Sequence, residues 1–212
     1  MFGNKGQFFL ITALIFVIYF SVLFSSSLSY ETTIESRKYL EFYIYSDYFE
    51  NFKSELGKIF TYFYDNSSMK NFVKNFTIYA RDKFDLKDMG LREIFLLASY
   101  DTIQANQEQI LSISLLNLLN KGISNINITF NYNNTSRTQS SLEDSNFFET
   151  FFGFNIASDS TYKLILKYND GENQSYEIDV PLKIVKSKKI GFWVVSLKID
   201  GSLIKDTFEN VG

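Results

Sequence analysis

The sequence contains no cysteine, no histidine and only one proline in 212 residues. Without cysteine the chain cannot form a disulfide, a thiolate nucleophile or a zinc–thiolate site. Without histidine it lacks the commonest general base and the commonest transition-metal ligand. It also contains no phosphate-binding glycine loop and no G-x-S-x-G turn. We therefore expect a protein that is not an enzyme, with no catalytic residue, no cofactor and no metal site.

The charge balance is nearly neutral, with a formal net charge of -3. Because nucleic-acid binding depends on a clear excess of lysine and arginine, we expect no nucleic-acid partner. At 45% hydrophobic residues the composition is that of a globular protein. The length suits one sizeable domain with an appendage, or two small domains.

One long apolar run, residues 8–24 (FFLITALIFVIYFSVLF), dominates the N-terminal region. As a helix it would be about 26 Å long, which is enough to cross the hydrocarbon core of a membrane. Lys5 is the only charged residue before it. The positive-inside rule then predicts a cytoplasmic N-terminus and places everything after Phe24 outside the cell.

Three interpretations fit this run: an uncleaved anchor, a secretory signal cut near Ser25–Ser27, or a pilin-type signal. The third depends on Lys5–Gly6–Gln7, which stands directly before the apolar residues. This arrangement resembles the class III signal of archaeal type IV pilin precursors. The resemblance implies a prepilin peptidase that cuts between Gly6 and Gln7 and leaves the apolar helix on the mature protein. Many such pilins carry glutamate where this chain has Ile11, which favours a minor component over the main filament subunit.

Helical patterns continue up to Gly90. Residues 25–41 contain nothing that stops a helix, so we expect the membrane helix to extend as a stalk. An apolar seam with helical spacing then runs from Tyr45 to Phe63. Asp65–Ser68 offers turn and N-cap chemistry for a further helix with Met69, Phe72, Phe76 and Ala80 on one face, which should end before a left-handed Gly90.

Beyond Gly90 the hydrophobic period falls towards two, which predicts strands. We expect strands at 94–100, 126–132, 162–168, 176–182 and 190–199, with a short one after Asp200–Gly201. Asn169–Asp170–Gly171 predicts a hairpin turn, and Pro181 predicts an edge strand. Residues 110–117 fit a strand or a helix, and the alternating serines favour the strand. The polar stretch Asn131–Ser145 is predicted to be a mobile loop.

These patterns predict an α+β protein: a long N-terminal hydrophobic helix and a helical junction, followed by a C-terminal β-sandwich. The predicted parts are a leader (1–6), a membrane and stalk helix (7–44), a helical junction (45–90) and a β-sandwich head (91–212). The pilin resemblance implies the same order of hydrophobic helix and β-rich head.

The chain holds six N-x-S/T sequons, which are candidate N-glycosylation sites if the head lies outside the cell. They are Asn66, Asn75, Asn127, Asn133, Asn134 and Asn173.

Together these features lead to a pilin-like structural or adhesive subunit of the cell surface, a candidate for assembly into an extracellular filament as a minor component. Its partners would be the membrane, the prepilin peptidase and other pilin-like subunits that pack through the N-terminal helix. The alternative is a permanently membrane-anchored extracellular binding module that does not polymerise. A membrane-tethered hydrolase that relies on carboxylates has no motif in its favour.

The predicted topology is testable with protease added to intact cells whose wall has been removed. Because Lys5 is the only charge flanking the apolar run, the chain beyond about residue 45 should be digested. The measurement is a blot that follows the C-terminal end of the chain. Complete protection of the head in intact cells, with digestion only after lysis, would contradict both leading interpretations.

Overall fold

The computed structural model describes residues 43–63, 65–85, 89–102, 109–132, 134–154, 160–182, 189–199 and 202–211. The chain divides into two compact units, Met1–Asn51 and Phe52–Gly212. In the first unit the described residues, 43–51, are helical. The predicted leader and all but the last two residues of the predicted membrane and stalk helix lie outside the described residues. No helix in the described part of the chain has both the length and the apolar character to span a bilayer.

The second unit opens with helical residues 52–57 and two helices, and continues with strands that form two antiparallel sheets. The five-stranded sheet has the order β5-β2-β1-β8-β9, and the four-stranded sheet has the order β4-β3-β6-β7. The elements are α2 (Ile59–Tyr62), α3 (Asn66–Asp85), β1 (Met89–Thr102), β2 (Gln109–Leu118), β3 (Ile123–Phe130), β4 (Thr135–Leu142), β5 (Phe147–Phe154), β6 (Ser160–Asn169), β7 (Asn173–Leu182), β8 (Lys189–Ile199) and β9 (Ser202–Val211).

The two sheets enclose one apolar core, which confirms the predicted β-sandwich. Alternate residues of β1 and β2 face this core, and so do those of β3, β6 and β7 in the opposite sheet. Residues 110–117, which fitted two patterns, belong to strand β2. Gly171, with φ +111°, forms the predicted turn between β6 and β7, and Pro181 lies in β7 at an edge of the four-stranded sheet.

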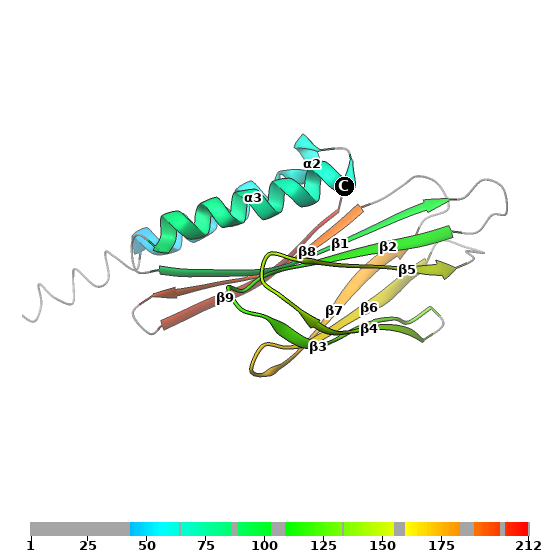
Figure 1. Cartoon of the computed structure of the whole chain (residues 1–212). Coiled ribbons are helices and arrows are strands. Elements are labelled where there is room, and N and C mark those ends of the chain that lie inside the picture. Colours follow the sequence, from blue (N-terminus) through cyan, green and yellow to red (C-terminus); the bar gives the residue numbers. More distant parts are fainter. Residues whose placement is uncertain are drawn as a thin grey trace, which may run out of the picture. The chain divides into compact units, whose positions relative to one another are not determined.

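The outer face of the five-stranded sheet is covered by helix, so that its central strands are buried on both sides. Figure 1 shows α3 lying along this sheet, on the side opposite the four-stranded sheet. Antiparallel sheets commonly leave one face in water and then alternate apolar with polar residues. Here residues 94–98 of β1 and residues 190–195 of β8 are instead buried at every position. The α3 side chains that fill the interface are Met69, Val73, Thr77, Ala80 and Phe84.

Trp193 is the largest side chain buried in this outer layer. Its ring stacks on Phe95 of β1 and on Phe208 of β9, with both centroid distances at 4.9 Å, and Phe60 of α2 meets it edge-on. Aromatic pairs of this geometry add about 1 kcal/mol each beyond the area that they bury. A Cβ on Gly191 would lie 2.3 Å from the indole ring. A residue with a side chain at position 191 would clash with the indole, so glycine is needed there for Trp193 to occupy this position.

Helix α3 begins as the sequence predicts, because the carboxylate of Asp65 accepts a 2.7 Å hydrogen bond from the backbone N–H of Ser68. This bond lowers the pKa of Asp65. The predicted apolar face is only partly correct. Met69 and Ala80 are buried, whereas Phe72 and Phe76 are half-buried and stack on each other with centroids 5.5 Å apart.

Two details of the predicted helices are wrong. The seam from Tyr45 to Phe63 is not one helix, because the helix ends at residue 57 and α2 starts after a turn at Lys58. Helix α3 ends before Gly90 as predicted, at Asp85, but Gly90 is not its left-handed cap. Gly90 lies in β1 opposite Lys198 of β8, since the pairing of β1 with β8 starts at Met89.

The predicted mobile loop Asn131–Ser145 is also wrong, because it contains strand β4. This strand lies at an edge of the four-stranded sheet, and five of its eight residues are serine or threonine. Backbone ladder bonds do not require apolar side chains, and an exposed edge does not impose hydrophobic alternation. The Thr129 and Ser136 hydroxyls, 2.8 Å apart, pair across β3 and β4.

Glu93 of β1 is a fully buried acid beneath α3. Its Oε2 accepts a 2.5 Å hydrogen bond from the Thr77 hydroxyl, and Oε1 has no partner among the described residues. Burial raises the pKa of Glu93 from 4.5 to about 8, although the bond from Thr77 opposes the shift. The native state therefore holds this proton more tightly than the unfolded chain does.

Because the pKa of Glu93 is raised on folding, the free energy of unfolding should fall as pH rises from 4.5 to about 8. The slope from this one group is at most about 1.4 kcal/mol per pH unit. Glu93→Gln keeps an acceptor for Thr77 but cannot ionise. We expect it to remove this slope in urea unfolding and to be more stable than the wild type at pH 8.

Glu177→Gln is the control. The hydrogen bond from Lys163 lowers the pKa of Glu177, so this carboxyl group does not titrate between pH 4.5 and 8, and the variant should keep the wild-type slope. Equal slopes in the wild type and in Glu93→Gln would contradict the assignment.

Candidate functional site

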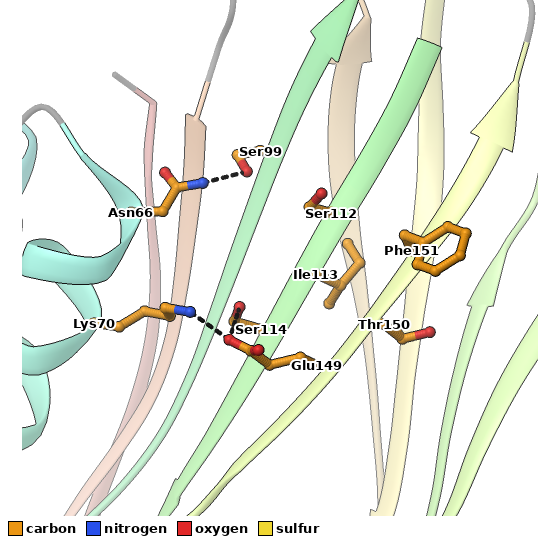
Figure 2. Close-up of a pocket in the computed structure, with 9 residues that line it drawn as sticks. All are labelled: Asn66, Lys70, Ser99, Ser112, Ile113, Ser114, Glu149, Thr150 and Phe151. Carbon is orange, nitrogen blue, oxygen red and sulfur yellow. Dashed lines mark hydrogen bonds and ion pairs between the residues drawn. The ribbon is translucent and has the colours of Figure 1, made fainter. Parts of the chain in front are cut away.

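A polar pocket of about 300 Å³ opens on the outer face of the five-stranded sheet, beside the N-terminal turn of α3. Figure 2 shows Asn66 and Lys70 reaching towards it from the helix, with serines of β1 and β2 between the helix and β5. Glu149 and Phe151 of β5 lie on the far side. Helix, sheet centre and sheet edge each contribute to the same pocket.

The residues that form the floor of the pocket are paired across neighbouring strands. Ser99 of β1 pairs with Ser112 of β2, which pairs in turn with Phe151 of β5. Ser114 pairs with Glu149 in the next row. Paired residues on antiparallel strands share a face of the sheet, so these side chains stand side by side. The pattern Leu-Ser-Ile-Ser-Leu at 111–115 places these serines in the pocket, because its apolar residues face the sandwich core and its serines face outwards.

An ion pair joins the two walls of the pocket. The Lys70 ammonium contacts the Glu149 carboxylate, and the Ser114 hydroxyl lies 3.4 Å from the same oxygen. The hydrogen bond from Lys70 lowers the pKa of Glu149, so the carboxylate is charged at neutral pH. The Glu149 side chain remains 59% exposed, and such a pair contributes little to stability. Its charges are accessible from the pocket.

Asn66, the first residue of α3, ties the helix to the sheet. Its Nδ2 donates a 2.7 Å hydrogen bond to the Ser99 hydroxyl. Its Oδ1 is buried and has no partner among the described residues. Buried amide oxygens are normally satisfied, so Asn66 Oδ1 is an unusual unsatisfied acceptor beneath this end of the pocket.

The arrangement suits binding through hydrogen bonds and one apolar surface. Hydroxyl, amide, ammonium and carboxylate groups all face or border the pocket, and the Phe151 ring is 60% exposed at its rim. In the part of the chain that the structure describes, no three acidic side chains come close enough to hold a metal ion.

Comparison with known proteins gives no assignment: no protein-family model matches the chain, and no curated protein matches its sequence. The pilin resemblance of the first residues therefore stays a prediction. The cleavage position at Gly6 and Gln7 lies outside the described residues, as does the sequon Asn133.

The five described sequons differ in access. Asn66 uses its amide nitrogen in the bond to Ser99, and Asn127 is half-buried, with its Oδ1 accepting from the Thr129 hydroxyl at 3.1 Å. Asn75 is exposed on α3. Asn134 and Asn173 are exposed at the turn before β4 and at the start of β7. The structure thus favours the last three as acceptors.

Sequence reasoning did not find the pocket. The sequence shows that serines alternate with apolar residues in β2, but it does not show which residues of β5 lie beside them. The β5 sequence, Phe147–Phe154, has phenylalanine on both faces, which hides the period of two. Of these rings, Phe152 and Phe154 are buried and Phe151 is exposed, a difference that only the pairing of β5 with β2 establishes.

If the head is glycosylated, mass mapping of the native protein should find glycan at Asn75, Asn134 or Asn173 and none at Asn66. A glycan on Asn66 would replace a hydrogen of the amide that is packed against Ser99. Two matched variants each remove the exposed serine hydroxyl that a sequon requires. Ser175→Ala should abolish modification of Asn173. Ser68→Ala, which destroys the sequon of Asn66, should leave the glycan mass unchanged. Full occupancy of Asn66 in the folded protein would contradict this order.

Proposed function

We propose that the chain is a pilin-like subunit of the cell surface, structural or adhesive, that is processed between Gly6 and Gln7. The observation that carries the proposal is the combination of a head with its own complete core and the signal that precedes it in sequence. The unit Phe52–Gly212 has a two-layer apolar core of its own. The apolar run 8–24 precedes this unit in the sequence, and its composition suits a separate task in a membrane.

That task requires the apolar side chains of residues 8–24 to be kept out of water. An apolar helix in a bilayer satisfies its own backbone polar groups and exposes its side chains to lipid. On extraction from the membrane it requires other apolar helices around it, because exposure of such a surface to water is strongly unfavourable. Other subunits with the same segment would supply that environment, while the β-sandwich heads remain in solvent. The absence of glutamate at Ile11 supports a minor role in such a filament.

The alternative is a permanently anchored extracellular binding module, and the pocket beside α3 is the observation that favours it. A binding head does not need a filament. The two functions share the topology, with the N-terminus in the cytoplasm and the head outside, and differ in the fate of residues 1–6.

The mature N-terminus decides between them. For the pilin-like subunit, intact mass of the native protein should correspond to a chain that starts at Gln7. Gly6→Val should abolish this processing, because a small residue before the cut lets the backbone approach a membrane-embedded peptidase. Insertion into the membrane should be unchanged, since the apolar run is intact.

Gly3→Val provides the matched control, because it adds the same side chain to the leader away from the cut. It should be processed as the wild type is. A native chain that still carries Lys5 would establish the anchored module. A start near Ser27 would identify a secretory signal and rule out both.

A further inference from the structure

We propose that the pocket beside α3 binds a single neutral sugar residue, with the Phe151 ring as its stacking surface and the serine row as its hydrogen-bonding floor. The proposal goes beyond the pilin-like function, since it applies equally to a filament subunit and to an anchored module. It concerns only the unit Phe52–Gly212.

Phe151 is an exposed aromatic ring at the rim of the pocket. Of the five phenylalanines of β5, two are buried, with Phe152 at 1% and Phe154 at 4% exposure, and two are half-buried, whereas Phe151 is 60% exposed. An exposed ring of this size costs hydration free energy unless something covers it. The C–H face of a sugar ring is an apolar surface of matching size, and the negative face of an aromatic ring attracts polarised C–H groups.

A set of polar groups lies next to that ring. Ser112 is the strand partner of Phe151, and Ser99 lies one strand further along the same row. Serine hydroxyls both donate and accept hydrogen bonds, as the hydroxyls of a sugar do. The Lys70 ammonium adds donors and the Glu149 carboxylate adds acceptors. The serines, the lysine and the glutamate can therefore hydrogen-bond to several hydroxyls of a sugar ring that is stacked on Phe151.

Charge defines the class of sugar. Lys70 and Glu149 are the charged residues among those lining the pocket, and they neutralise each other in an ion pair. A uronic acid would have to compete with Glu149 for Lys70, and an amino sugar would compete with Lys70 for Glu149. A neutral sugar can hydrogen-bond to both partners and leave the pair intact.

Size defines the number of units. A volume of about 300 Å³ is at the lower limit of ligand pockets, which suits one monosaccharide unit. Among the described residues the rim beyond Phe151 is open, because a Cβ on Gly153, two residues further along the strand, would meet none of them within 4 Å. A sugar in the pocket can therefore belong to a longer glycan that continues across this rim.

The test uses the full chain in lipid nanodiscs, because common detergents carry sugar headgroups that would compete. Saturation-transfer NMR with glucose, galactose, mannose and N-acetylglucosamine should show binding of at least one of them, with a dissociation constant in the millimolar range. Phe151→Ala and Ser112→Val should each weaken that binding about tenfold. Phe151→Tyr should retain it, since the ring remains.

The control is Tyr79→Ala, which removes an aromatic ring of 61% exposure from α3 and should change the affinity less than twofold. Equal melting temperatures would show that the variants are folded. The proposal is overturned if none of the four sugars binds, if Phe151→Ala binds as the wild type does, or if Phe151→Tyr loses binding with Phe151→Ala. Tighter binding of glucuronate or glucosamine than of the neutral sugars would overturn the neutral class.

Discussion

The two-sided burial of β1 and β8 is the constraint on which the rest of this unit depends. A sheet whose central strands are apolar on both faces has to be covered twice, because each uncovered face would leave a large hydrophobic surface in water. The four-stranded sheet covers one face and the helices cover the other. Trp193 shows how closely the outer layer is fitted, since its position requires a glycine at 191 and aromatic partners from three other elements.

The candidate site lies where this cover ends. Under α3 the outward residues of β1 are Phe95 and Leu97, but at the start of the helix the sheet presents Ser99 and the serines of β2 instead. Asn66 and Lys70 of the first helical turns then face a polar platform, and the edge strand β5 completes it. Glu93 is the exception beneath the helix. A buried acid costs stability, and its bond to Thr77 fixes how α3 sits on β1.

The exposed sequons are divided between the two faces of the sandwich. Asn134 and Asn173 flank strands of the four-stranded sheet, whereas Asn75 lies on α3, on the same face as the pocket (Figure 1). Glycans at Asn134 and Asn173 would therefore leave the proposed sugar site open, and a glycan at Asn75 would stand on the same side as that site.

The sequence by itself determined the β-sandwich, the hairpin at Asn169–Asp170–Gly171 and the start of α3 at Asp65, because each is specified by neighbouring residues: a period of two, a turn that needs a positive φ, and a local cap. It did not determine β4, whose serines and threonines form a strand only because β3 provides a partner. Nor did it determine which phenylalanine of β5 is exposed, since both faces of that strand are aromatic. The pocket was decided by tertiary structure alone, because it joins α3 to three strands through register and packing, and no local pattern encodes contacts between residues so far apart in the chain.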